Sequence, residues 1–398
     1  MCILVKFMFK KVRQFFTFLL LLCYTKANCQ LLNKNDTTRE HMFGGVSVFF
    51  DEDFFLGMTP FTTNLDRDYT GGGALQLNGK FIEKSNINIL NVLLDKFTRL
   101  DKIHHKNSIN RFNSLKFGLT TFTPRGIFLN KTYPIQNDRP YANIAFISTS
   151  RTSADMFEES AITTELELGM LGTSLGETTQ AGIHSLYRKK HNLCDTCRPY
   201  APKGWGNQIS NGGEFTGEYS VTYKKLINLN FISTANENGP PKYPLKYFDA
   251  FYTGSAYLGH YTAMEGTLTA RAGIIRSRWW VFNSYPLGAN AEAKIGADST
   301  RGKHFRNWEF YLFGTFRPKA ILYNAALEGQ FKPTAFSYNP TQINHFGAQG
   351  EVGLTFSFAY FFTLNAVYTI RSTEFQHESP TCHSWIGVYF TARCPFYK

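Results

Sequence analysis

The chain has 398 residues, and its 42 Lys and Arg against 30 Asp and Glu give a formal charge of +12. No block of Lys and Arg is interleaved with aromatic residues, which argues against a nucleic-acid partner. After residue 29 no segment is apolar for long enough to cross a membrane as a helix. The chain is rich in aromatic residues and in glycine.

The N-terminus is typical of an export signal. Four basic residues precede an apolar run at 15–24, and small residues follow at Ala27-Asn28-Cys29. Cleavage near Gln30 would leave 37 basic and 30 acidic residues, a charge of +7, which favours anionic lipid surfaces. Lipidation at Cys23 or Cys29 is the weaker alternative. We therefore expect a signal peptide at 1–29 and one membrane domain at 30–398.

Residues 30–398 contain repeated segments with period-2 alternation, which predict an all-β fold, a transmembrane antiparallel barrel of about twelve strands. A barrel with both termini in the periplasm needs an even number, so a stretch with an internal Pro318 counts as one long strand. The predicted strands are 44–51, 70–80, 113–122, 141–151, 160–170, 214–225, 248–259, 261–274, 308–331, 346–358, 361–371 and 383–394.

The alternation also predicts which side chains face the lumen. In the last strand, even-numbered residues from Ile386 to Ala392 are apolar and suit lipid, whereas their odd-numbered neighbours suit a polar lumen. In the strand that begins at Thr70, residues Gln76 and Asn78 share its parity and Leu75 opposes it. The pattern therefore predicts that Thr70 points inward.

Odd strands then run outward and place four connections outside the cell: 52–69, 123–140, 171–213 and 372–382. The connections 81–112, 226–247 and 275–307 lie in the periplasm, where turns are usually short. We expect a helix at 88–100 in the first of these and another at 178–190 in the long outer loop.

The outer connections carry the candidate chemistry. Asp51-Glu52-Asp53 supplies hard oxygen ligands of the kind that Ca²⁺ accepts, although such a cluster is commonly only a solvated rim. On the outer loop helix, Gln180 and His184 are spaced i, i+4 and share a face. A histidine there could activate water while Ca²⁺ polarises an ester carbonyl, but an ordinary surface histidine is the alternative.

Two further motifs flank this chemistry. Asp66 to Gly72 ends in a hydroxyl and glycines at a strand start, and could equally be a polar turn. Asp138-Arg139-Pro140-Tyr141 could equally be a structural salt bridge with a proline-fixed turn, which is the interpretation favoured for Asp138, whereas Arg139 is left open as a phosphate contact. The candidate substrate-binding residues are Arg67, Arg139 and Trp205.

Four cysteines remain after the signal. Cys194 and Cys197 could close a local disulfide or, with nearby His184 and His191, contribute to a zinc site. Cys382 and Cys394 flank a strand and would lie roughly 40 Å apart if it is continuous, so we do not expect them to pair.

Taken together, these motifs resemble the outer-membrane lipid A 3-O-deacylase family from about residue 44 to the C-terminus. Members carry Asn-Asp after the first strand, Asp-x-x-Tyr-Thr-x-Gly, Asp-Arg-Pro-Tyr-Ala-Gly, Gln-x-x-x-His, Gly-Trp-x-x-Gln and Arg-Thr-x-Glu-Phe. The corresponding stretches are Glu52-Asp53, Asp66 to Gly72, Asp138 to Asn143, Gln180 to His184, Gly204 to Gln208 and Arg371 to Phe375. Glu52 stands where the family has Asn, and Asn143 where it has Gly.

The resemblance implies a twelve-stranded, Ca²⁺-dependent esterase of the bacterial outer membrane that removes an acyloxyacyl chain from lipid A of lipopolysaccharide. His184 would be the base, with Thr70 and Asp53 beside the reacting atoms and Gln180 supporting the loop helix. Glu52 and Asp53 would hold the metal. A monomer among outer-membrane lipids is the expected state.

Two rival functions remain. An outer-membrane phospholipase needs a serine paired with a histidine, for which only His383-Ser384 is available at a strand start. A passive pore or binding barrel would conduct ions and would tolerate loss of His184, whereas a lumen filled by polar side chains argues against it.

Overall fold

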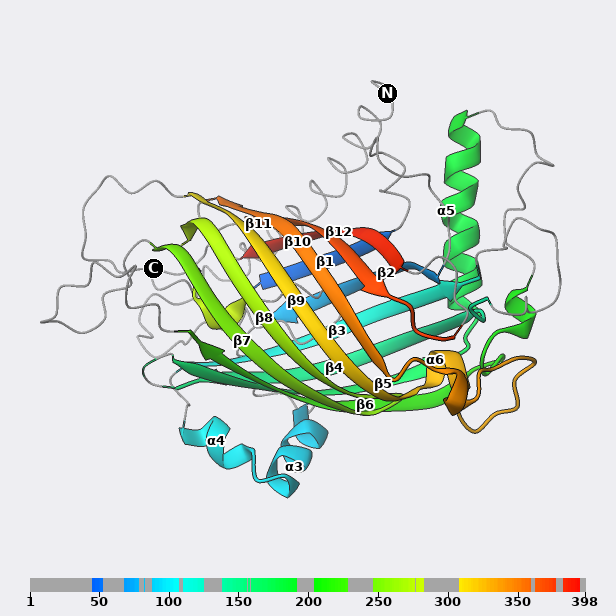
Figure 1. The fold of residues 1–398 in the computed structure, drawn as a ribbon, viewed down its shortest axis with the longest axis horizontal. Coiled ribbons are helices and arrows are strands. Elements are labelled where there is room, and N and C mark those ends of the chain that lie inside the picture. Colours follow the sequence, from blue (N-terminus) through cyan, green and yellow to red (C-terminus); the bar gives the residue numbers. More distant parts are fainter. Residues whose placement is uncertain are drawn as a thin grey trace, which may run out of the picture.

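The computed structural model describes the barrel together with most of its connections (Figure 1). The expected signal peptide, Asp53, Arg67, Cys194, Cys197 and Cys394 lie outside the described residues. The described residues are 45–52, 68–78, 82, 88–106, 110–124, 138–155, 157, 159–191, 204–227, 246–275, 277–282, 308–358, 362–376 and 382–393.

Twelve antiparallel strands form a closed barrel in which each strand pairs with its neighbours in sequence and β1 pairs with β12. The predicted fold class is therefore confirmed. The strands are β1 Gly45–Glu52, β2 Asp68–Asn78, β3 Asn110–Thr123, β4 Ala142–Ala154, β5 Ser160–Leu171, β6 Glu214–Leu226, β7 Lys246–Gly259, β8 Tyr261–Ile275, β9 Trp308–Asn324, β10 Phe346–Phe358, β11 Phe362–Ser372 and β12 Cys382–Arg393.

The two ends of the barrel are distinguished by the first and last strands. Gly45, where β1 begins, lies opposite Arg393, where β12 ends. We call this the inner end, and the end where β1 finishes at Glu52 the outer end. All four connections expected outside the cell leave from the outer end. Cys382, at the outer end of β12, is exposed and free.

The prediction of a ninth strand reaching residue 331 is wrong. β9 ends at Asn324, whose side chain accepts a hydrogen bond from the Ala326 amide and thereby starts the short helix α6, Ala325–Glu328. Pro318 does lie within β9, opposite Ala348 of β10. It interrupts the ladder toward β8, as a residue without an amide proton must.

Side-chain alternation separates a polar lumen from an apolar outer surface. Along β10, Glu351 and Thr355 are buried inside, whereas Val352 and Leu354 are 61% and 42% exposed. β12 follows the predicted alternation, with its odd-numbered residues buried. An apolar band facing outward on every strand is the pattern of a lipid-facing barrel.

The inner end of the lumen is filled by the segment after β8. Residues 277–282 turn back into the barrel through the short helix η5, Trp279–Val281, and pack Trp279 and Phe282 against Phe251 of β7. The Lys224 ammonium donates a 2.6 Å hydrogen bond to the Phe282 carbonyl and so fixes the segment. The lumen is therefore plugged by aromatic side chains at this end.

Helices occupy the longer connections. α3, Ile89–Phe97, and α4, Asp101–Lys106, join β2 to β3, and α5, Leu175–His191, joins β5 to β6 (Figure 1). These confirm the expected helices at 88–100 and 178–190, while α4 was not anticipated. Within the described residues, no helix combines the length and the apolar character needed to cross a membrane.

Candidate active site

A β-bulge at Thr70 determines which face of the barrel wall its hydroxyl occupies. Tyr69 lies opposite Phe122, but the next pair is Gly71 with Thr121, so Thr70 is the extra residue in β2. The bulge reverses the alternation on which the inward prediction depended. Tyr69 faces the lumen, where its hydroxyl donates to Asp51, and that prediction for Thr70 is wrong.

Thr70 instead belongs to a cluster of hydroxyls on the outward face. Its Oγ1 contacts Oγ1 of Thr123, and Thr121 Oγ1 donates a 2.8 Å hydrogen bond to the Gly71 carbonyl. Thr121 and Thr123 lie on the same face of β3 as Phe117, which is 43% exposed on the outer surface of the barrel. Nevertheless all three threonines are buried. The hydroxyl cluster therefore lies on the outward face of the barrel wall and is shielded from solvent.

The end of β1 lies beside this hydroxyl cluster. Glu52 is registered opposite Gly71, one residue from Thr70, so the expected metal-binding pair begins beside the hydroxyl cluster. Asp53 lies outside the described residues, and so does the side chain of Glu52. Asp51 points the other way, into the lumen, where the hydroxyls of Tyr69 and Tyr389 donate to its carboxylate at 3.1 and 2.8 Å. It is therefore unavailable to a metal on the outward side.

The face of α5 that turns toward the protein carries the predicted histidine. Gly176 and Gln180 are buried and His184, one turn further, is half-buried, so these three positions form a stripe spaced i, i+4, i+8. The helix contacts β3 and β4 at their outer ends. Gln180 and His184 are thus on the side of the helix that faces the wall carrying the hydroxyl cluster.

A tryptophan holds the helix in this orientation. Trp205, in the short helix η4 (Trp205–Asn207), is 1% exposed and its indole Nε1–H donates a 2.9 Å hydrogen bond to Oε1 of Gln180. Its ring packs on Tyr141 with centroids 4.9 Å apart. A Cβ at Gly176 would lie 2.7 Å from the same ring, so only glycine allows this approach. Trp205 therefore supports the helix and is not exposed to a substrate.

The departure from the family pattern at Asn143 also has a structural role. Its Nδ2 donates to the Thr173 carbonyl at 2.7 Å and to Oε1 of Gln208 at 2.6 Å, and Thr173 Oγ1 donates to its Oδ1 at 2.7 Å. These bonds connect β4 to the segment that begins α5 and to the loop carrying Trp205. A glycine could form none of them, and the sequence offered no signal for this network.

Arg139 lies on the lumen side and is committed to an ion cluster. Its Nη1 contacts the carboxylate of Glu374, which also accepts Arg371 at 3.1 Å, and its guanidinium stacks 4.1 Å above the Phe122 ring. At 1% exposure it is poorly placed to meet a lipid phosphate. The geometry favours the salt-bridge interpretation of the Asp138–Tyr141 motif, and it joins that motif to the late Arg371–Phe375 motif.

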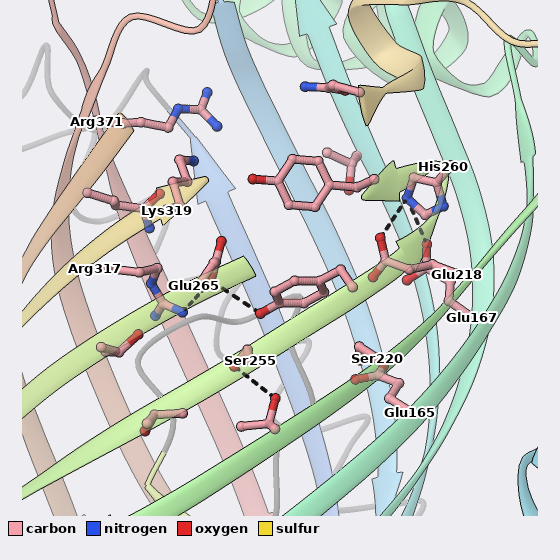
Figure 2. A pocket seen from close by; sticks show the side chains of 18 of the residues that line it. Glu165, Glu167, Glu218, Ser220, Ser255, His260, Glu265, Arg317, Lys319 and Arg371 are labelled. Atoms are coloured by element: carbon pink, nitrogen blue, oxygen red, sulfur yellow. Dashed lines mark hydrogen bonds and ion pairs between the residues drawn. The ribbon is translucent and has the colours of Figure 1, made fainter. Parts of the chain in front are cut away.

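A separate cavity of about 190 Å³ lies within the lumen. Figure 2 shows its acidic side, where Nε2 of His260 lies 3.6 Å from Glu167 and 3.8 Å from Glu218. Arg317 of β9 forms ion pairs with Glu265 of β8 and Glu351 of β10, the two neighbouring strands, each at 3.3 Å. The cavity is on the opposite side of the wall from Thr70, and none of the predicted catalytic or metal-binding residues that the structure describes lines it.

No three His, Cys, Asp or Glu side chains are arranged to hold a metal ion within the part of the chain that the structure describes. The residues expected to bind Ca²⁺ are Glu52 and Asp53. Glu52 is the last described residue of β1. The candidate site therefore has two described parts, the hydroxyls of Thr70, Thr121 and Thr123 and the stripe of α5.

The fold is a membrane β-barrel whose outer end carries a buried hydroxyl cluster on the wall and a loop helix that contacts β3 and β4. The family described as outer membrane protein LpxR matches residues 15–393, and the chain belongs to that family. Its localisation is accordingly the outer membrane. Family membership and the matching barrel together support an outer-membrane lipid A deacylase.

Solved structures agree with the fold. LpxR from Salmonella typhimurium is 14% identical, with a TM-score of 0.56 over 87% of this chain and 99% of that one. The beta domain of the Bordetella autotransporter BrkA is 8% identical over 89% and 99% of the two chains, with a TM-score of 0.37 that is too low to support an argument. No curated protein matches the chain.

Proposed function

We propose that the protein is a Ca²⁺-dependent esterase that hydrolyses the 3-linked acyloxyacyl ester of lipid A in the outer leaflet. The observation that carries this proposal is the position of Thr70 and the α5 stripe on the outward side of the wall at the outer end. A lipid in the outer leaflet meets the barrel on that side. A substrate confined to the lumen would not reach it.

The reaction needs a base, and His184 is the residue that we assign. Its imidazole accepts a proton from water as the water oxygen attacks the ester carbonyl carbon. The same imidazole returns the proton to the departing sugar oxygen when the carbon–oxygen ester bond breaks. The products are a free acyloxyacyl acid and a lipid A 3-hydroxyl, which balances the atoms of substrate and water.

Other residues position the reacting groups. Thr70 offers a hydroxyl to the reacting ester, and Gln180 keeps α5 in place through its bond from Trp205. Glu52 and Asp53 would hold Ca²⁺, which supplies Lewis-acid polarisation of the carbonyl when bound. Arg67 remains the candidate contact for a lipid A phosphate, since Arg139 is engaged by Glu374.

The structure disfavours both rival functions. His383 and Ser384 are consecutive residues of β12 and therefore point to opposite faces of the wall, so they do not form a nucleophile–base pair. The lumen is plugged by Trp279 and Phe282 at the inner end, and charged side chains such as Arg317, Glu265 and Glu351 line its wall. A continuous water-filled pore does not fit this interior.

We expect the purified protein to act on lipid A and not on glycerophospholipids. Mass spectrometry of hexa-acylated lipid A incubated with the protein in Ca²⁺ should show loss of one intact acyloxyacyl unit, and an EGTA-treated sample should show none. A parallel incubation with phosphatidylethanolamine serves as the substrate control. Unchanged lipid A in Ca²⁺, or release of fatty acid from the phospholipid instead, would contradict the proposal.

A further inference from the structure

The long inner connection between β2 and β3 forms a helical hairpin, α3–α4, that lies against the outside of the barrel. Figure 1 shows it beside β4, β5 and β6, away from the lumen. The strand residues that it contacts include Arg151 of β4, Thr164 of β5 and Tyr219 of β6. Arg151 shares the alternation of Ile147, which is 38% exposed on the lipid-facing surface. The hairpin therefore covers a polar patch on an otherwise apolar wall.

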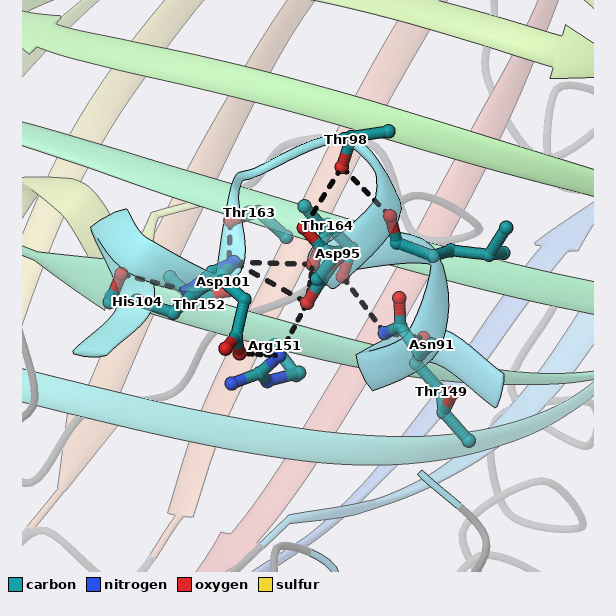
Figure 3. A network of polar contacts seen from close by, with 12 residues as sticks. Asn91, Asp95, Thr98, Asp101, His104, Thr149, Arg151, Thr152, Thr163 and Thr164 are labelled. Carbon is teal, nitrogen blue, oxygen red and sulfur yellow. Dashed lines mark hydrogen bonds and ion pairs between the residues drawn. The ribbon is translucent and has the colours of Figure 1, made fainter. Parts of the chain in front are cut away.

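One aspartate in α3 organises this contact (Figure 3). Asp95 Oδ2 accepts Arg151 Nη1 at 2.5 Å and Thr164 Oγ1 at 3.1 Å, and its Oδ1 accepts the Tyr219 hydroxyl at 2.9 Å. Arg151 reaches Asp101 of α4 as well, at 3.2 Å. Arg151, Thr164 and Tyr219 thus all donate to one carboxylate, which is how a polar patch beneath a membrane-facing surface is satisfied.

The rest of the hairpin extends the same network. Asn91 Nδ2 donates to the Thr149 carbonyl at 3.1 Å, four residues before Asp95 on the same helix face. In α4, the His104 ring nitrogens lie 2.9 Å from Ser153 Oγ and 3.2 Å from Thr164 Oγ1. Asn91, Asp95 and His104 are all fully buried. The polar face of the hairpin is therefore turned inward, onto the wall.

Its apolar face is turned outward. This polarity is the reverse of a helix on a water-soluble protein, which buries its apolar stripe and exposes charge. The exposed apolar side chains continue the lipid-facing belt of the barrel beyond the strands. They are Ile89 (50%), Leu90 (52%), Leu93 (54%), Phe97 (87%) and Ile103 (41%).

Basic side chains accompany this apolar face. Lys96, Arg99 and Lys102 are exposed around the turn between α3 and α4. Long cationic side chains at the edge of an apolar helix face reach lipid phosphates while their stems stay in the acyl region. The combination matches one environment, the boundary between acyl chains and headgroups.

We propose that α3–α4 is an interfacial anchor embedded in the inner leaflet of the outer membrane. Leu90, Leu93 and Phe97 contact phospholipid acyl chains, Lys96 and Lys102 bind headgroup phosphates, and the Asp95–Arg151 network clamps the hairpin to the barrel. The anchor fixes the depth and tilt of the barrel in the bilayer. This inference is independent of the hydrolytic activity, since the hairpin lies at the opposite end from α5.

Spin-label accessibility tests the anchor in the full mature chain, with Cys194, Cys197, Cys382 and Cys394 replaced by serine. A nitroxide at Phe97→Cys is measured in vesicles of phosphatidylethanolamine and phosphatidylglycerol, against oxygen and a water-soluble nickel complex. Leu268→Cys on β8, 53% exposed, gives the lipid-facing reference, and Lys102→Cys the polar one. Heat-shifted gel migration confirms that each labelled barrel is folded.

We expect the label at 97 to collide several-fold more with oxygen than with nickel, as at 268, and the label at 102 to favour nickel. Nickel collision at 97 equal to that at 102 would place the hairpin in water and overturn the proposal. Low collision with both reagents would mean that a protein surface, either a second copy or another periplasmic partner, covers this face. That outcome overturns it equally.

Discussion

Replacing His184 with alanine should reduce lipid A deacylation by a factor of about 10²–10⁴, the usual contribution of a positioned general base. The barrel itself should remain folded, because His184 lies on a connection and not in the strand network. The measurement is the initial rate of acyloxyacyl release from lipid A, followed by mass spectrometry at saturating Ca²⁺.

The matched control for that variant is Ser185→Ala. The Ser185 hydroxyl donates only to the Gly182 carbonyl within the same helix, so its loss perturbs α5 to a similar small degree. We expect near-normal activity from Ser185→Ala. Equal activity of the His184→Ala and wild-type proteins would show that the base lies elsewhere.

Replacing Glu374 with glutamine should destabilise the barrel by roughly 3–5 kcal/mol, the typical effect of breaking a buried ion pair. The substitution removes the carboxylate that Arg139 and Arg371 share. Both guanidinium groups would then remain buried at the outer end of the lumen without this negative partner. The temperature at which heat-modified gel migration shifts should fall clearly. Glu159→Gln, which removes the same charge from an exposed turn, should leave it unchanged.

Because Glu374 is ionised in the folded protein, we expect the barrel to lose stability when the pH falls. Burial opposes ionisation of Glu374, but Arg139, then Arg371 and Lys319, outweigh it and hold its pKa well below the usual range. Because the folded pKa is lowered, the stabilisation is complete above the unfolded value of about 4.3 and is lost as the pH falls below it. We expect the temperature at which the gel migration of the wild-type protein shifts to be constant from neutral pH to about pH 5. It should decrease below about pH 4. The Glu374→Gln variant should show a shallower acid slope.

The strands were predictable because lipid and lumen impose opposite demands on alternate residues. β10 was predicted at its exact bounds, 346–358, and no other strand but β9 was misplaced by more than three residues at either end. β9 was overextended because Ala325 and Leu327 continue its apolar pattern. The strand ends at the local Asn324 cap and at a contact with a distant residue, the 2.8 Å hydrogen bond from the Ala325 amide to the His260 carbonyl.

The roles of the predicted site residues stay predictions, and the structure bears on their positions only. The Gln180-x-x-x-His184 spacing was enough to place both on one helix face, and the structure turns that face to the wall. The inward prediction for Thr70 failed because one bulged residue inverts a period-2 pattern without leaving a mark in the composition. The hydrogen bonds of Asn143 and the pairing of Arg139 with Glu374 join segments far apart in sequence, which no local pattern encodes.

The central claim of the proposed function is that His184 lies close to Thr70 on the outward side of the barrel wall. Photocrosslinking tests it directly, with p-benzoylphenylalanine in place of His184 in the full chain and, as the control, in place of Thr179 on the exposed side of α5. Irradiation followed by peptide mass spectrometry should join position 184 to the outer ends of β1, β2 or β3, and position 179 to none of them. Absence of that crosslink from position 184 in a folded barrel would contradict the account.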